Sequence, residues 1–151
     1  MDRYWLKKGQ ILDVEDLDPD RDRCGLLWIY PSLPLAGDVT STIMAKVEAI
    51  ILSHDFEPNI GFNPISARAI EACIGIMYDL DIPSEYGRAI KCHDDDDDDD
   101  DVVVDWLISQ GHLLFRLGTQ SMGNLPLEVD RSISLFRRIK QAFDLEQIIS
   151  A

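Results

Sequence analysis

Short apolar runs and helically spaced apolar residues divide this chain into strands and helices. The run from Cys24 to Tyr30 is rich in aromatic and β-branched residues and stands just before Pro31, so it predicts a buried strand. After Gly37, apolar residues recur every three or four positions as far as His54, which predicts a helix. The predicted strands cover residues 24–30, 56–63, 67–78 and 112–118, and the predicted helices cover residues 39–54, 85–110 and 132–143.

The order of these elements, βαββαβα, predicts an α+β fold of the ferredoxin-like kind, with helices on one face of an antiparallel sheet. Within residues 67–78, alternation places Ile74 and Ile76 on one face and Glu71 and Cys73 on the other. One carboxylate therefore interrupts an otherwise apolar strand. We expect residues 1–23 to be a charged lead-in and residues 24–151 to form the domain.

The composition is that of an ordinary folded domain with a strong acidic bias. The 151 residues are 46% hydrophobic and carry a formal net charge of −14, more than half of which comes from consecutive aspartates at residues 94–101. Nucleic acids and anionic membranes require a basic surface, so we expect neither as a partner. The N-terminus lacks the apolar segment of a signal peptide and no apolar run is long enough to span a bilayer, so we expect a cytoplasmic protein.

The aspartate run falls inside the predicted helix 85–110. Adjacent carboxylates repel one another and are poor helix formers, so we expect the helix to break there or to start late, near Val102. Three interpretations of the run stay open: an acidic loop, a weak cation-binding segment that lacks the spaced oxygens and glycine of an EF-hand, and an error in the sequence itself.

Cysteine and histidine spacing argues against disulfides and metal sites. Cys24, Cys73 and Cys92 are odd in number and widely spaced, so they predict reduced thiols, and we expect Cys24 and Cys73 to be buried. The three histidines are not spaced as a metal-binding set, so we expect no bound metal.

Two charged residues stand out on predicted strands. Arg116 lies between two apolar residues, and its guanidinium must either meet an anion or point to solvent. Glu71 is either on a solvated sheet face or a carboxylate that accepts a proton in catalysis.

Several short motifs stand in a suggestive order over residues 23–151. They are Cys24 to Pro31 with Gly37 downstream, His54 to Pro58, Tyr78-Asp79, Gly111 to Arg116, Gln120 to Met122 and Ile139 to Ile148. In this order and spacing they resemble the C-terminal cap domain of the FAD-linked oxidases, in the group of vanillyl-alcohol oxidase and 4-cresol dehydrogenase (hydroxylating). The resemblance implies a two-domain enzyme, in which a larger domain binds FAD and the cap closes over the flavin to form the substrate cavity.

The resemblance also implies the reaction and its catalytic residues. The family oxidises 4-alkylphenols or related small aromatic alcohols by hydride transfer to FAD, and a cytochrome or oxygen then accepts the electrons. Arg116 matches the arginine that stabilises the phenolate, while Phe115 stands where the family has a tyrosine, so one hydrogen-bond donor is missing. Glu71 stands in place of a family histidine and becomes the candidate proton acceptor.

Further positions concern the cavity and the cofactor. Aromatic side chains on these strands either line the substrate cavity or simply pack in the core or at an edge of the sheet. In vanillyl-alcohol oxidase a histidine near the first cap strand anchors FAD, and here that stretch holds Gly25 and Leu26, so we expect FAD to be non-covalent. The residues expected to bind substrate are Trp28, Tyr30, Phe115 and Gln120.

The chain contains no G-x-G-x-x-G segment that would cradle a diphosphate, so we expect FAD to be bound mainly by another domain or subunit. Three hypotheses follow: the cap domain of a flavin-dependent oxidoreductase, a non-catalytic ferredoxin-like module for ligand binding or assembly, and a truncated inactive fragment. The expected partners are a FAD-binding domain or subunit and a small aromatic substrate, and the sequence leaves a homodimer open.

Overall fold

The computed structural model describes residues 17–93, 102–116, 138, 139 and 142 of the chain. The chain divides into two compact units, Met1–Leu117 and Gly118–Ala151. In the second unit, residues 138, 139 and 142 are helical, and the rest of the predicted helix 132–143 lies outside the described residues. All further structural statements concern the first unit.

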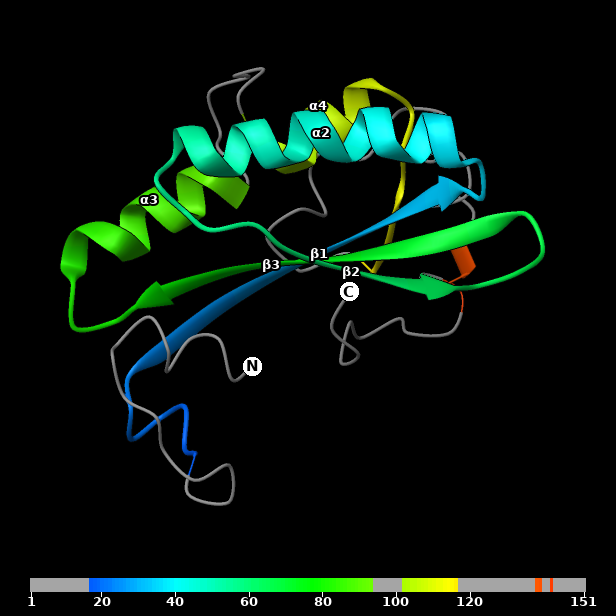
Figure 1. Cartoon of the computed structure of the whole chain (residues 1–151). Coiled ribbons are helices and arrows are strands. Elements are labelled where there is room, and N and C mark those ends of the chain that lie inside the picture. Colours follow the sequence, from blue (N-terminus) through cyan, green and yellow to red (C-terminus); the bar gives the residue numbers. More distant parts are fainter. Residues whose placement is uncertain (1–16, 94–101, 117–137, 140–141, 143–151) are drawn as a thin grey trace. The chain divides into compact units, whose positions relative to one another are not determined.

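The first unit is an α+β fold, which confirms the predicted class (Figure 1). All strand pairs are antiparallel, and the strands lie in the order β2-β3-β1-β4. This arrangement, with its crossover between β1 and β2, is compatible with a ferredoxin-like fold. The elements are β1 (Cys24–Pro34), α2 (Gly37–Ser53), β2 (Asn59–Pro64), β3 (Ala69–Asp79), α3 (Pro83–His93), α4 (Val103–Ser109) and β4 (Leu114–Arg116).

The helices α2, α3 and α4 lie on one face of the sheet (Figure 1). Alternate residues of β1 and β3, such as Ile29, Ile74 and Ile76, point toward them and are buried, as the period-2 geometry of a strand requires. Removing this apolar area from water stabilises the unit at roughly 25 cal/mol per Å². The core side chains at 0% or 1% exposure include Ile29, Val47, Ile50, Ile51, Ile74, Ile76, Val103, Val104 and Leu107.

Strand β1 is longer than predicted, because Pro31 does not end it. The pairing of β1 with β3 resumes beyond the proline in unchanged register, with Ser32 opposite Glu71. Pro31 instead faces Leu114 on the short strand β4, where the ladder is irregular and a missing N–H costs little. The strand ends at Pro34.

The region predicted as helix 85–110 contains two helices, α3 and α4. Helix α4 begins at Val103, beside the late start predicted near Val102, while residues 94–101 lie outside the described part. Glu85 in the first turn of α3 is buried, and its carboxylate accepts a 2.7 Å hydrogen bond from the backbone N–H of Asp79. This bond ties the start of α3 to the end of β3.

Candidate functional site

The face of the sheet turned away from α2, α3 and α4, called the distal face below, carries the predicted site residues. In β3, Ala72 and Ile74 are fully buried toward the helices, while Glu71 and Cys73 point the other way and are half-buried. The alternation predicted for this strand is therefore confirmed. In β1, the same alternation sends Trp28 to the distal face.

Arg116 reaches the distal face because of an irregularity in the β1–β4 ladder. Arg116 pairs with Tyr30 and Leu114 pairs with Pro31, so two steps on β4 match one step on β1. A bulge of this kind turns a side chain to the opposite face. As a result the Arg116 guanidinium carbon lies 5.9 Å from the centre of the Tyr30 ring, while Leu114 still packs against the core.

Two aromatic rings extend this group along β1. The Trp28 and Tyr30 rings stack, with 5.7 Å between their centroids and 26° between their planes. Gly75 on β3 lies opposite Trp28, and a Cβ there would come within 3.1 Å of the indole. The glycine therefore leaves space for the Trp28 ring.

A polar cluster lies on β2 and β3 of the same face. The Asn63 side-chain amide donates to the Glu71 carboxylate at 3.4 Å and to the Cys73 Sγ at 3.1 Å. The Cys73 thiol also lies 3.9 Å from the same Glu71 oxygen, within the range of a sulfur hydrogen bond. Asn63 thus orients a carboxylate and a thiol together.

Two groups on the distal face, the Tyr30 phenol and the Cys73 thiol, have raised pKa values. Burial raises the pKa of Tyr30, and Cys73 and Glu71 raise it further, against the opposing effect of Arg116. Burial also raises the pKa of Cys73, with Glu71 adding to the effect. Near pH 7 the Tyr30 phenol and the Cys73 thiol therefore keep their protons.

The structure brings four predicted site residues onto one face: Trp28, Tyr30, Glu71 and Arg116. Phe115 is half exposed on β4, and Gln120 lies outside the described residues.

Sequence reasoning missed Asn63, and it placed Cys73 on the correct face without including it among the site residues. The prediction that Cys24 and Cys73 are buried is wrong: both are partly exposed on the distal face, and Cys92 on α3 is the buried thiol. The alternation that placed Glu71 on this face also placed Cys73 there, and it was the available signal. The place of Asn63 beside Glu71 could be recognised only from the β2–β3 register, in which the two residues face each other.

Gly25 and Gly75 of the sheet do not form a site for the diphosphate of FAD. The closely approached glycines make room for the protein's own rings: a Cβ at Gly25 would meet the Tyr78 ring, and one at Gly75 would meet Trp28. Phosphate-binding glycines instead leave backbone N–H groups open to the ligand. These two glycines therefore do not fit the role of diphosphate-binding glycines for FAD.

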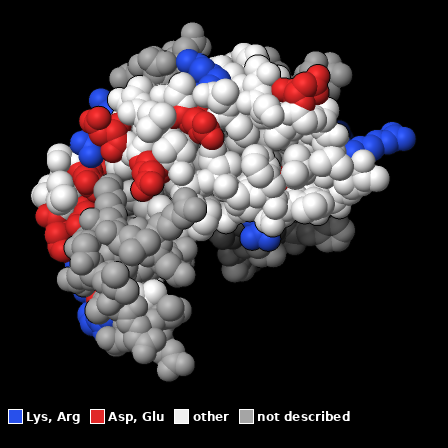
Figure 2. Space-filling model, viewed as in Figure 1, with Lys and Arg blue, Asp and Glu red and all other residues white. Residues whose placement is uncertain are grey.

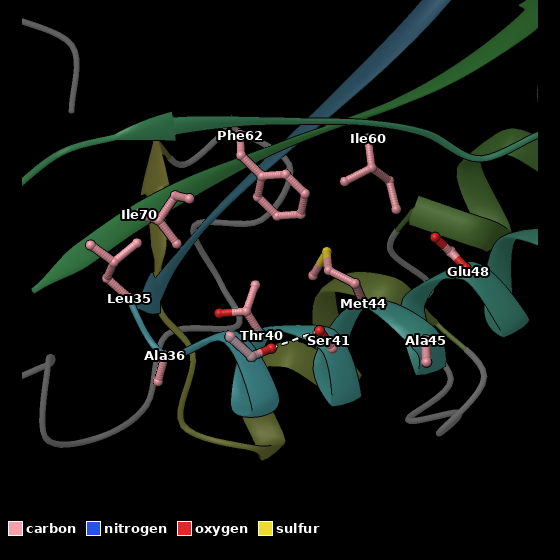
Figure 3. A pocket seen from close by; sticks show the side chains of 11 residues that line it. Leu35, Ala36, Thr40, Ser41, Met44, Ala45, Glu48, Ile60, Phe62 and Ile70 are labelled. Carbon is pink, nitrogen blue, oxygen red and sulfur yellow. Dashed lines mark hydrogen bonds between the residues drawn. The ribbon is translucent and has the colours of Figure 1, made fainter.

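A groove lies on the other side of the sheet, between α2 and the β2–β3 hairpin (Figure 3). Its volume is about 540 Å³, and Met44 of α2 faces Ile60 and Phe62 of β2 across it. Glu48 is the single charged residue of its lining. The groove is therefore mainly apolar and separate from the distal face.

The described residues contain neither a membrane-spanning helix nor a metal-binding cluster. No helix in residues 17–93 and 102–116 is long and apolar enough to cross a membrane. Over the same described part, no three His, Cys, Asp or Glu side chains are grouped so that they could hold a metal ion.

Comparison with known proteins gives one informative likeness. No family model matches the chain. The chain is 35% identical, over 147 residues, to a 1'-carboxy-chondrochloren decarboxylase from Chondromyces crocatus. The match covers 97% of this chain and 26% of that protein, so the chain spans about a quarter of the length of this relative.

Proposed function

We propose that this chain is the substrate-binding cap domain of a flavin-dependent oxidoreductase that acts on a small aromatic substrate carrying an anionic oxygen. The observation that carries the proposal is the position of Arg116 beside the stacked rings of Trp28 and Tyr30, with Glu71 on the same face. The substrates in view are 4-alkylphenols and related aromatic alcohols. FAD would be held mainly by another domain or subunit, and a cytochrome or oxygen would accept the electrons.

The spacing across the sheet suits one aromatic ring. Arg116 on β4 and Glu71 on β3 flank the central strand β1. Neighbouring strands lie about 4.8 Å apart, so the backbones of β3 and β4 are about 10 Å apart. A phenolate oxygen at the guanidinium would then leave the rest of the substrate over Tyr30, with its far end toward Cys73 and the neighbouring Glu71.

Each residue has a defined task in this proposal. The Arg116 guanidinium holds the anionic oxygen through charge-assisted hydrogen bonds. The protonated Tyr30 hydroxyl supplies a neutral donor near the same place, where Phe115 offers none. Glu71, oriented by Asn63, accepts a proton at the opposite end of the substrate.

The relative favours a second candidate reaction, decarboxylation of an aromatic or similarly flat carboxylate. Its printed name describes removal of a carboxyl group from a carboxy compound. A carboxylate pairs with a guanidinium as readily as a phenolate does, often through two parallel hydrogen bonds. The same Arg116 site therefore serves both candidates, and the product distinguishes them.

The test is flavin reduction by the chain combined with a FAD-binding partner protein, from a neighbouring gene or from the same longer polypeptide. We expect 4-alkylphenols to bleach the flavin absorbance, and Arg116→Ala to slow bleaching at least tenfold while flavin content stays unchanged. Arg68→Ala, at an exposed position outside the distal face, is the matched control and should leave the rate unchanged. Loss of CO₂ from an aromatic carboxylate would support the second candidate instead.

A complete lack of flavin in every combination would contradict the oxidoreductase proposal and leave the non-catalytic binding module or an inactive fragment. Equal effects of Arg116→Ala and Arg68→Ala would show that Arg116 is not a substrate ligand. The cytoplasmic location expected from the sequence stays a prediction, which fractionation of the producing cells would test.

A further inference from the structure

The outer edge of β2 has features of an interaction surface. Strand β2 lies at one end of the sheet order, and within the described residues it pairs only with β3. Its sequence, Asn-Ile-Gly-Phe-Asn-Pro, contains no charged residue. Edge strands are usually protected against pairing by charges, bulges or a covering element. Among the described residues, no other strand pairs with the outward-pointing backbone groups of Asn59 to Asn63.

The sequence of this edge is nearly a palindrome. Residues Pro58 to Pro64 read Pro-Asn-Ile-Gly-Phe-Asn-Pro, which is almost the same in both directions around Gly61. An antiparallel pair of identical strands is two-fold symmetric, so each residue faces its mirror position in the other copy. With Gly61 on the axis, Asn59 faces the partner's Asn63 and Ile60 faces the partner's Phe62. The prolines at both ends limit the paired segment to five residues.

This register also buries exposed apolar surface. Phe62 is 46% exposed, and together with Ile60 it lines the groove beside α2 (Figure 3). Pairs between an aromatic and a β-branched side chain are favourable across strands, and the two-fold axis creates two of them. The area over β2 in Figure 2 is mainly uncharged, whereas acidic side chains gather at the opposite end of that view. Like-charge repulsion is therefore small at this edge.

We propose that the chain forms a homodimer in which β2 pairs antiparallel with β2 of a second copy, centred on Gly61, so that the two sheets become continuous. A second copy is the partner because the strand is complementary to itself. The paired segment is only five residues long, so association should be weak, as it is for small interfaces. The inference does not depend on the proposed enzymatic function.

Gly61 offers a specific way to break the pair. A Cβ at Gly61 meets no atom within 4 Å, so the monomer accepts a side chain there. In the dimer, Gly61→Lys would set two ammonium groups against each other on the axis, and like charges directly opposite are destabilising. Gly87→Lys is the matched control, because Gly87 on α3 is exposed and its Cβ position is equally open.

The experiment is sedimentation velocity of the full 151-residue chain over a wide concentration range. We expect the average mass of the original chain and of Gly87→Lys to rise toward that of a dimer, and Gly61→Lys to stay monomeric. An equimolar mixture of Gly61→Lys and Gly61→Glu should associate again, because opposite charges then meet on the axis. Circular dichroism of each variant verifies that it is folded.

Three results would overturn the proposal. The first is an original chain that stays monomeric at every concentration. The second is a Gly61→Lys variant that associates as strongly as Gly87→Lys, and the third is a folded mixture of Gly61→Lys and Gly61→Glu that fails to associate. The second result would place the contact on another surface.

Discussion

The two faces of this sheet are built from alternate residues of the same strands, yet they serve different purposes. Toward the helices, Ile74 and Ile76 of β3 are fully buried among other apolar side chains. On the distal face, Glu71 and Cys73 of the same strand are half-buried and bonded to Asn63. The helix-covered face supplies stability, which leaves the distal face able to carry polar and aromatic groups.

The largest expected difference between the faces is in stability, and neighbouring residues of β3 test it. Ile74→Ala removes a fully buried side chain and leaves a cavity, which should lower the free energy of unfolding by about 2–5 kcal/mol. Cys73→Ala on the distal face should cost less than about 1 kcal/mol, because it removes a half-buried thiol. Urea unfolding of both variants measures the two values, and equal losses would show that both faces are core.

The next largest expected effect is a loss of stability at high pH, caused by the burial of Cys92 on the helix side of the sheet. Burial raises the pKa of this thiol from its ordinary value to about 12. A pKa that is raised in the folded state contributes stability below the unfolded pKa, and this contribution is lost as pH rises toward the folded pKa. Between pH 9 and pH 12, ionisation of Cys92 should therefore lower the free energy of unfolding, by up to about 4 kcal/mol.

Cys92→Ala is the control for this pH dependence. Tyrosines and lysines also titrate in the same range, so the quantity to compare is the difference between the two unfolding profiles. The variant should lose less stability than the original chain between pH 9 and pH 12. Parallel profiles would mean that Cys92 is not buried in solution.

Alternation and helical spacing predicted the element order and the fold class, because both depend on local contrasts between apolar and polar residues. The end of β1 was mispredicted at Pro31, since the sequence does not reveal that this proline faces a short, irregular neighbour. Glu71 was placed on the correct face by the same alternation. The contacts of Arg116 with Tyr30 and of Asn63 with Glu71 depend on strand order and register, which single-strand patterns do not contain.

A smaller difference between the two faces is expected in the reactivity of their thiols. Cys73 should react with iodoacetamide more slowly than a free thiol at pH 8.5, because burial and Glu71 raise its pKa. Glu71→Gln removes a negative charge and should speed the reaction of Cys73 several-fold. Cys92 should stay unmodified in the folded chain.

Mass spectrometry of the cysteine-containing peptides measures each rate separately. Asn63→Ala tests the orientation of the pair and should change the rate at Cys73 less than Glu71→Gln does. An unchanged rate at Cys73 in Glu71→Gln would contradict the contact between the two side chains.

The proposed function places ligand binding on the distal face rather than in the apolar groove beside α2. Its most direct test is chemical-shift mapping by NMR, in which the chain is titrated with a 4-alkylphenol and with an aromatic carboxylate. The account predicts saturable shifts at Trp28, Tyr30 and Glu71 that disappear in Arg116→Ala and persist in Arg68→Ala. Shifts confined to Met44, Ile60 and Phe62 in the groove, unaffected by Arg116→Ala, would contradict it.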